Sequence, residues 1–330
     1  MKTALVGSVL WAALTVAALA QPAAPVACDR NCLDGFVDRY IDAMQAHAAR
    51  PDLFARDAKF TENGIRLPLG NEGLWFKMSG KGTYKFYVPD VETQQVAFIG
   101  TLREGGSNAN DGTLVGFALR LKVVKNLITE AEQLVIRPET PLGGAAAPAT
   151  PPRFPPVGEA VEKMGAPNPI FAQVIPASKR PSREEMIKTA NYYFAGLQRN
   201  DGKGYYPFTD DCDRFENGMQ TTNIPQRDPA TGQTVTRGCK KQFEESLKGI
   251  VSRIRDRRFV AVDRERGIVF SFAFFDHENI NWTWQLAELF KVENGQIRRI
   301  EAVFHRAPYG INSGWSTYEQ GLSEEPQSIR

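Results

Sequence analysis

Two stretches of the chain carry the spacing of apolar residues that is typical of an amphipathic helix. The first spans residues 33–47, and the second follows Ser182 and Glu185, whose spacing predicts a helix-capping box. The apolar positions of the first stretch are Phe36, Val37, Tyr40, Ile41 and Met44. Those of the second are Met186, Ile187, Ala190, Tyr193, Phe194 and Leu197. We therefore predict one helix near the start of each half of the chain.

Each predicted helix is followed by a set of runs rich in β-forming residues. In the first half these runs span 84–88, 96–102, 113–124 and 128–136. In the second half they span 258–262, 268–275, 282–292 and 297–304. The run 263–267 and the pair Asn294-Gly295 have the composition of hairpin turns. Each half is therefore predicted to be a helix followed by a meander of long antiparallel strands.

Two phrases occur twice in the chain, in the same order. Phe-Thr-Glu-Asn-Gly at 60–64 returns as Phe-Glu-Asn-Gly at 215–218, and Ile-x-x-x-Glu-x-x-x-x-Arg at 128–137 returns at 297–306. The second pair of phrases is separated by more residues than the first, so the second copy carries an insertion. The pattern predicts an internal duplication, and it defines the architecture before it says anything about activity.

A stretch rich in Pro, Ala and Gly, residues 138–181, separates the two copies and is predicted to be an interdomain linker. We expect the domains to span 28–137 and 182–315. A chain of 330 residues has the length of two ordinary domains. Its formal net charge of +2 gives no electrostatic reason to expect nucleic acid or an anionic membrane as a partner.

The N-terminus has the pattern of a signal peptide. Lys2 precedes an apolar stretch at 4–18, which is short for a membrane span, and Ala18-Leu19-Ala20 is a small-x-small cleavage site. We expect residues 1–20 to be removed and the mature protein to be periplasmic or secreted, with no integral membrane segment. Lipid attachment at Cys28 is the alternative.

The predicted export bears on the state of the four cysteines. An even number in an oxidising compartment predicts two disulfides, which we expect to join Cys28 to Cys32 and Cys212 to Cys239. The alternative is metal ligation, but no histidine falls at zinc-ligand spacing from either pair. We expect neither a metal nor a cofactor.

Several of these motifs carry a family resemblance: the closing strand Ile-x-x-Ile-Glu-Ala-Val-Phe at 297–304, the run from 60–64 to Gly73-Leu74-Trp75, and the run that begins at 274–277. They resemble the SnoaL-like branch of the nuclear-transport-factor-2-like superfamily, and within it a family of secreted bacterial and fungal proteins of uncharacterised function. The resemblance implies an α+β fold of two tandem cone-shaped domains, each a helix plus a curved antiparallel sheet. Since this fold includes dehydratases, isomerases, lyases and binding proteins, the resemblance does not decide the function.

The resemblance also implies a concave, mainly apolar pocket in each domain, where a carboxyl would have a raised pKa and serve as a proton shuttle. In the last strand of the second copy, Arg299, Glu301 and His305 share one face. We predict that Glu301 and His305 exchange the proton, although a salt bridge between Glu301 and Arg299 is the alternative. In the first copy, Ile136 stands where His305 would be, so the second pocket is predicted to be the active one.

Three further residues are expected to support this chemistry. His277 or Glu216 would polarise the substrate, and Arg258 would hold an anionic group; for Glu216, capping of the Asn-Gly turn is the alternative. Loop-borne aromatic residues could stack on a sugar or aromatic substrate. These aromatic residues are Tyr205, Tyr206, Tyr309 and Trp315.

The sequence lacks a nucleophile elbow, a Gly-rich phosphate loop, an HExxH motif and a dinucleotide fingerprint. We therefore predict an exported, cofactor-independent acid/base enzyme, a lyase, dehydratase or isomerase of a small carbonyl-bearing, polyol or aromatic compound. A non-catalytic periplasmic or secreted binding protein for small molecules is the alternative. Formation of a homodimer through an exposed sheet face is a further expectation.

Overall fold

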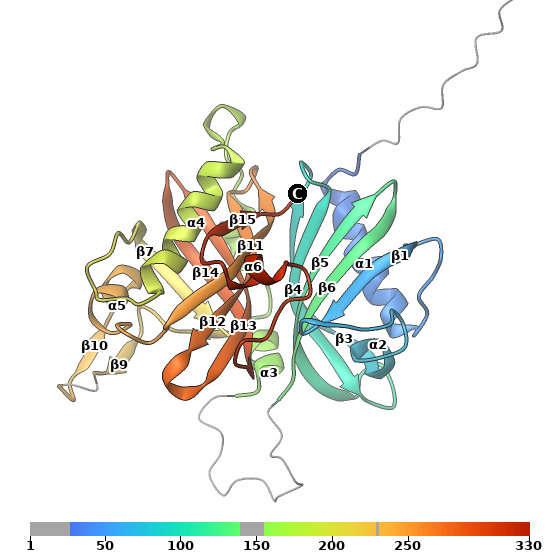
Figure 1. Ribbon diagram of the computed structural model, residues 1–330, viewed down its shortest axis with the longest axis horizontal. Helices are drawn as coiled ribbons and strands as arrows, with labels where there is room; N and C mark the ends of the chain where they lie inside the picture. Colours follow the sequence, from blue (N-terminus) through green and yellow to red (C-terminus); the bar gives the residue numbers. More distant parts are fainter. Residues whose placement is uncertain (1–26, 139–154, 229–230) are drawn as a thin grey trace, which may run out of the picture.

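The computed structural model describes residues 27–138, 155–228 and 231–330. The predicted signal peptide at 1–20 and the Ala/Pro-rich centre of the predicted linker lie outside these ranges. Two domains follow each other along the chain, each with a helix on one face of a curved sheet (Figure 1). The predicted α+β fold class of two tandem domains is confirmed.

The first domain contains the elements α1 (Arg30–Gln45), β1 (Phe54–Glu62), β2 (Ile65–Arg66), α2 (Leu74–Lys77), β3 (Met78–Asp90), β4 (Gln95–Gly105), β5 (Gly112–Val124) and β6 (Leu127–Ile136). Its sheet has the strand order β2-β1-β6-β5-β4-β3. All neighbours are antiparallel except β1 and β6, which run parallel.

The second domain begins with α4 (Arg183–Leu197), β7 (Phe208–Glu216), β8 (Met219–Gln220), β9 (Pro225–Arg227), β10 (Thr234–Thr236) and α5 (Cys239–Glu245). It continues with β11 (Arg253–Asp263), β12 (Ile268–His277), η3 (Glu278–Ile280), β13 (Trp282–Glu293), β14 (Gln296–Pro308), α6 (Tyr318–Leu322) and β15 (Pro326–Ser328). The sheet order is β15-β11-β12-β13-β14-β7-β8.

The two sheets have the same order once β15 is set aside, with β7 parallel to β14 as β1 is to β6. The duplicated phrases occupy matching places: Glu62 pairs with Gln133 in the first sheet, and Glu216 pairs with Ala302 in the second. The predicted meander therefore lacks one strand in each domain. Each Glu-Asn-Gly phrase ends an additional strand that crosses back to lie parallel to the last one.

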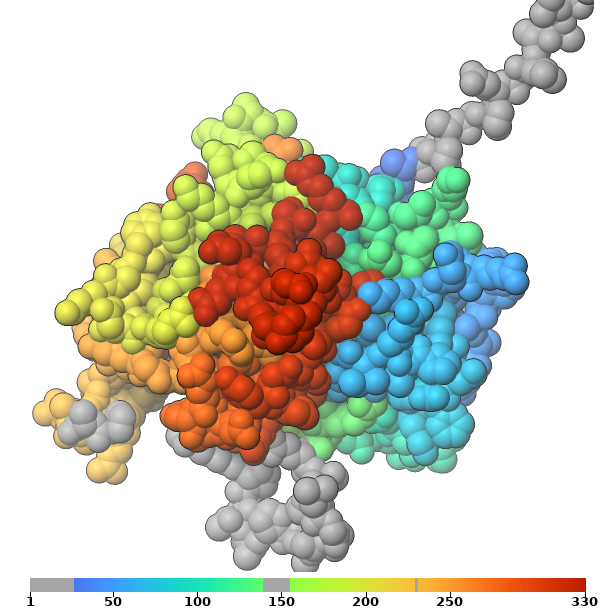
Figure 2. All heavy atoms as spheres, in the orientation of Figure 1, coloured from blue at the N-terminus to red at the C-terminus, as the bar shows by residue number. Residues whose placement is uncertain are grey.

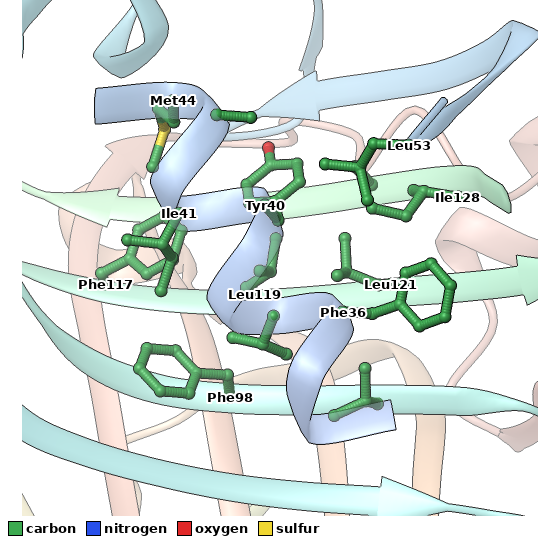
Figure 3. Close-up of a cluster of buried hydrophobic side chains, with 14 of the residues drawn as sticks. Phe36, Tyr40, Ile41, Met44, Leu53, Phe98, Phe117, Leu119, Leu121 and Ile128 are labelled. Atoms are coloured by element: carbon green, nitrogen blue, oxygen red, sulfur yellow. The ribbon is translucent and has the colours of Figure 1, made fainter. Parts of the chain in front are cut away.

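The predicted helix of the first copy packs on the inner face of its sheet (Figure 3). The Asp29 side chain caps α1 by accepting from the Cys32 backbone amide. Phe36, Tyr40 and Met44 of α1 are fully buried against apolar side chains of the sheet such as Leu119. Burial of three such side chains provides several kcal/mol, which a helix of this length needs in order to be stable.

The helix of the second copy, α4, is equivalent. The predicted capping box is present, since Ser182 accepts from the Glu185 amide and Glu185 accepts from the Ser182 amide. Its buried residues, among them Tyr193 and Phe194, pack against Phe290 of β13.

The outer faces of the two sheets pack against each other and form a second apolar layer, which we call the seam (Figure 1). Its buried residues from the first sheet are Tyr84, Phe86, Val88, Ala97, Ile99, Ala118, Leu134 and Ile136, and those from the second are Val260, Ala261, Ile268, Phe270, Phe272, Ala287, Leu289 and Val303. The sheet faces through which a homodimer was expected are thus covered within one chain.

Buried ion pairs cross the seam. Arg258 donates two hydrogen bonds of 2.7 Å to the Glu132 carboxylate, and both side chains are almost fully buried. Arg183 donates a single hydrogen bond to Asp90, and this pair is also fully buried. Buried pairs of this kind fix the relative orientation of the two surfaces, because a shifted register would leave buried charges unpaired.

The described part of the predicted linker is folded. Residues 155–181 contain α3 (Val157–Lys163) and the short 3₁₀ turns η1 (Pro169–Ala172) and η2 (Ala177–Lys179). Val161 and Phe171 are buried in the seam, and the Glu162 carboxylate accepts from the backbone amides of Thr83 and Tyr84. This segment is therefore more than a spacer, because it closes one edge of the seam.

The C-terminal segment closes another edge and covers the junction of the domains (Figure 2). β15 adds to the second sheet beside β11, and the Trp315 indole donates to Thr61 of the first domain at 2.8 Å. None of the described helices has the length and apolar character needed to cross a membrane.

Both predicted disulfides are present. Cys28, just before α1, is joined to Cys32 in its first turn, with Cα atoms 5.2 Å apart. Cys212 and Cys239 join β7 to the start of α5, with Cα atoms 5.7 Å apart.

Removing one member of the buried pair across the seam is expected to destabilise the protein. Glu132→Ala leaves the Arg258 guanidinium buried without its bidentate partner, a loss of about 3 to 5 kcal/mol in comparable pairs. Urea unfolding measures the change. The matched control is Glu92→Ala, because Glu92 pairs with Arg264 of the other domain at 3.9 Å while both side chains are exposed. This variant should lose less than about 1 kcal/mol, and equal losses for the two variants would contradict the role of the buried pair.

Candidate functional site

The inner face of the second sheet encloses a cavity of about 110 Å³. Its walls come from α4, the residues after α5 and four strands, and they are mainly apolar. The apolar lining residues are Leu197, Leu247, Ile250, Val251, Phe275, Trp284, Leu286, Ala302 and Phe304. Four polar side chains complete the lining: Tyr193, Arg214, Glu216 and Glu288. A closed apolar wall with a few convergent polar groups is the usual form of a small-molecule site.

A larger groove, of about 530 Å³, lies on the surface of the first domain along the turns at 92–94 and 122–126. It is lined mostly by exposed loop residues and contains no buried acid. We therefore place the candidate site in the smaller cavity, where the ionisable groups are withdrawn from water.

Glu288 lies in the cavity because of strand alternation in β13. Residues 284, 286, 288 and 290 face inward, while Ala287 and Leu289 face the seam. Glu288 is only 1% exposed, and one of its carboxyl oxygens, Oε2, has no hydrogen-bond partner in the described part of the chain. A buried acid with an unsatisfied oxygen beside a cavity is costly for folding, which makes it a candidate for function.

Burial holds the pKa of Glu288 well above its usual range, and the negative charge of Glu216 adds to this effect. The positive charge of Arg214 and a hydrogen bond with Tyr193 oppose it. Since burial is the largest cause, the carboxyl of Glu288 is a neutral acid under conditions where an exposed glutamate is charged.

Glu216 differs from Glu288 because it has a cationic partner. The Arg214 Nε lies 3.4 Å from the Glu216 Oε1, and the Glu216 side chain is partly exposed. Arg214 is itself buried, and it donates to Thr221 Oγ1 at 3.1 Å and to Gln242 Oε1 at 2.8 Å. The cavity therefore contains two carboxyl groups in unlike surroundings, one buried and one partly exposed beside a guanidinium.

An aromatic wall faces these groups. Trp284 stacks on Phe304 with ring centroids 5.0 Å apart, and the His277 ring lies 4.4 Å from Trp284. His277 is buried, and burial lowers its pKa. Its Nδ1 lies 3.1 Å from the Phe275 carbonyl oxygen, while its Nε2 lacks a partner among the described residues. His277 thus lies behind the cavity wall as a neutral ring rather than in the lining.

The structure places the other predicted catalytic pair outside the cavity. Glu301 faces the seam, where it accepts hydrogen bonds from the Tyr84 hydroxyl and the Arg299 Nε, both at 2.9 Å. Burial raises its pKa. The expectation that Glu301 lines the pocket was therefore wrong: strand parity was read correctly, but it was assigned to the wrong face of the sheet.

His305 does not share a site with Glu301 either. Four residues along a strand correspond to about 13 Å, too far for direct proton exchange. The His305 Nε2 lies 3.1 Å from the Gln285 Oε1, and burial lowers the pKa of His305 to about 4. Among the predicted catalytic residues, only Glu216 lines the cavity.

The predicted substrate-binding residues also lie elsewhere. Arg258 binds Glu132 across the seam rather than an external anion. Tyr205 is 66% exposed and packs edge-on against Tyr192, Tyr309 is partly exposed, and Trp315 is held on the first domain by Thr61. None of these side chains lines the cavity, because the loops that carry them lie away from its walls.

The described part of the first domain lacks the equivalent constellation. Leu119 pairs with Gln133 as Glu288 pairs with Ala302, so a leucine stands in the place of the buried acid. Glu62, the counterpart of Glu216, accepts hydrogen bonds of 2.8 Å from the Leu74 amide, the Gln133 side chain and Arg137. With its oxygens occupied, this carboxylate is part of the structure of the first domain.

Sequence reasoning missed Glu288, Arg214 and Tyr193. A signal for Glu288 was present, since residues 284–292 alternate with apolar residues at every inward position except 288. Arg214 and Tyr193 have no comparable signal, because an arginine before Glu-Asn-Gly and a tyrosine in a helical stripe are both ordinary. Within the described ranges, no group of three or more His, Cys, Asp or Glu side chains is placed to hold a metal ion.

Comparisons with known proteins give the following matches. Residues 179–304 match the model of a family described as a domain of unknown function (DUF8021). No curated protein matches the chain. The family match covers the second domain up to β14, and so it includes the four polar residues of the cavity.

Solved structures that match include an LEH-like epoxide hydrolase of M. tuberculosis, 13% identical over 38% of this chain and 86% of that chain, with a TM-score of 0.26. A candidate ketosteroid isomerase from Kribbella flavida is 12% identical over 44% of this chain and 92% of that one, with a TM-score of 0.27. An NTF-2 like protein of unknown function from Burkholderia xenovorans is 13% identical over 41% and 94%, with a TM-score of 0.25. Each match has about the length of one of the two domains.

The burial of Glu288 should be measurable as a dependence of stability on pH. A carboxyl whose pKa is raised by folding binds its proton more tightly in the native state, so the free energy of unfolding falls as pH rises from the usual glutamate range toward the folded-state pKa. Glu288→Gln removes this effect. Urea unfolding between about pH 4.5 and 8 should therefore show that the variant gains stability over the wild type as pH rises.

The control is Glu278→Gln, at an exposed position, which should leave the difference from the wild type constant across this range. Parallel curves for Glu288→Gln and the wild type would contradict the raised pKa.

Proposed function

We propose that the second domain is a cofactor-independent acid/base enzyme, a lyase, dehydratase or isomerase, that acts on a small and mainly apolar compound with a carbonyl or hydroxyl group. The observation that carries this proposal is Glu288, a buried neutral acid at an apolar cavity that also contains the carboxylate of Glu216. One oxygen of Glu288 has no partner within the ranges that the structure describes. The size of the cavity supports a small substrate, since a cavity of about 150 Å³ accommodates benzene.

The two carboxyl groups would have different roles. In an isomerisation, the Glu216 carboxylate removes a proton from the carbon next to the substrate carbonyl. The neutral Glu288 donates a hydrogen bond to the carbonyl oxygen, where negative charge develops. Glu216 then returns the proton to a different carbon, so that both carboxyl groups end in their starting state.

Arg214 would keep Glu216 ready for this role. Its guanidinium lies 3.4 Å from Glu216 and would hold that carboxylate in a fixed position at the cavity. In an elimination, the same carboxylate would remove the proton while Glu288 protonates the hydroxyl, which departs as water; the proton on Glu216 then passes to Glu288 and restores both groups. Apolar walls exclude water from both steps and strengthen each electrostatic contribution.

The two disulfides support a protein that works in an oxidising compartment, and we include periplasmic or secreted localisation in the proposal. Its partner would be a small-molecule substrate. Cavity and chemistry lie within one chain, and a second copy is not needed to complete the site.

Deuterium exchange tests the proposal without knowledge of the natural substrate. The protein is incubated in D₂O with a set of small cyclic and aromatic ketones, and NMR follows incorporation of deuterium next to the carbonyl. Glu216→Gln should lower the exchange rate roughly 10² to 10⁴-fold through loss of the base. Glu288→Leu should lower it about 10² to 10³-fold, and Glu288→Gln by less because the amide can still donate a hydrogen bond.

The decisive comparison is with Glu301→Gln. Glu301 is also a buried carboxyl with a raised pKa, but it faces the seam, so exchange should remain near the wild-type rate. A large loss in Glu301→Gln with none in Glu216→Gln would move the site to the seam. If no ketone exchanges while ligands still bind in the cavity, a non-catalytic binding protein becomes the better description.

A further inference from the structure

Arg214 and Glu288 are both buried at the same cavity, yet they do not form an ion pair. The Arg214 guanidinium donates to the neutral oxygens of Thr221 and Gln242 and lies beside Glu216. It also interacts with the Tyr193 hydroxyl, which in turn interacts with Glu288. Among the described residues, the Glu288 Oε2 has no hydrogen-bond partner. A buried guanidinium and a buried carboxyl pair readily, so a specific interaction must keep them apart.

Gln242 provides this interaction. It lies in α5, is buried, and accepts from the Arg214 Nη2 at 2.8 Å while its own amide donates to the Thr221 carbonyl oxygen. Both Thr221 and Gln242 lie in the stretch between β8 and β11, where the second copy carries its insertion.

A disulfide holds α5 in place. Cys239 is the first residue of α5, and its partner Cys212 lies on β7, two residues before Arg214. The bond therefore ties the helix that carries the acceptor to the strand that carries the donor. Phe243, the residue after Gln242, packs against the Tyr193 ring with centroids 5.3 Å apart, so the same helix also supports Tyr193.

We propose that Gln242 is a positioning residue, which holds the Arg214 guanidinium away from Glu288 and so preserves Glu288 as a neutral hydrogen-bond donor. The inference rests on the proposed function for the meaning of the neutral acid, but the geometry stands without it. The ionisable groups that face Glu288 are Tyr193 from α4 and Arg214 and Glu216 from β7. Of these, Arg214 is the cation, and it opposes the burial that keeps Glu288 neutral, so a closer approach would favour the charged form.

Titration of Glu288 tests this inference directly and needs no substrate. Carbon-13 NMR of the glutamate carboxyl groups, with the Glu288→Gln variant identifying the signal, gives the titration midpoint. Gln242→Leu removes the acceptor, so Arg214 should turn to the free oxygen of Glu288 and lower its midpoint by about 1 to 3 pH units. An unchanged midpoint would overturn the proposal.

Two further variants separate positioning from packing. Gln242→Glu keeps the shape and binds Arg214 more strongly, so the midpoint should stay at least as high as in the wild type; a fall like that of Gln242→Leu would overturn the proposal. Gln226→Leu is the matched control, because Gln226 also donates to the Thr221 carbonyl, at 3.0 Å, and its hydrogen bond does not involve Arg214. Its midpoint should not change, and a fall would assign the effect to the loop as a whole.

Discussion

Each sheet of this protein is apolar on both faces, and the structure depends on covering both of them. A single helix can bury only one face, as α1 and α4 do, and the other face is buried by the second copy of the same domain. The folded part of the linker and the C-terminal segment close the edges of this seam. The fixed pairing of Arg258 with Glu132 then follows, since charges that enter such a layer must be matched there.

The same constraint explains what could be predicted from the sequence. Helices, strands, duplication and disulfides were predictable because they depend on local periodicity and on cysteine chemistry. The alternation of side chains along a strand correctly placed Glu301 on the same face as Arg299. It could not say whether that face lines the cavity or the seam, because both faces are buried and both carry occasional charged residues. Glu288 and Glu301 lie on neighbouring strands, and their side chains are on opposite faces of the sheet. Only the packing of the domains shows which face is the cavity and which is the seam.

The two buried carboxyl groups also differ in how their polar atoms are satisfied. Glu301 has a hydroxyl and a guanidinium as partners, which offset the cost of its burial. Glu288 keeps an oxygen for which the described residues supply no partner, even though a guanidinium is near. The cost of burying this oxygen without a partner lowers the stability of the folded protein. A structure that bears such a cost in one place needs compensation elsewhere, and the large seam provides it.

The replacement of the acid by Leu119 in the first copy has a consequence for how this chain can evolve. A copy that carries no reactive group can be selected for stability alone. The stability of the first domain also supports the second domain, since the two are joined along a continuous apolar layer. Substitutions around the cavity that would bring a single domain below its folding threshold therefore remain tolerable here. Duplication in this protein thus leaves the polar cavity in one half only, while both halves share the apolar layer that holds the fold together.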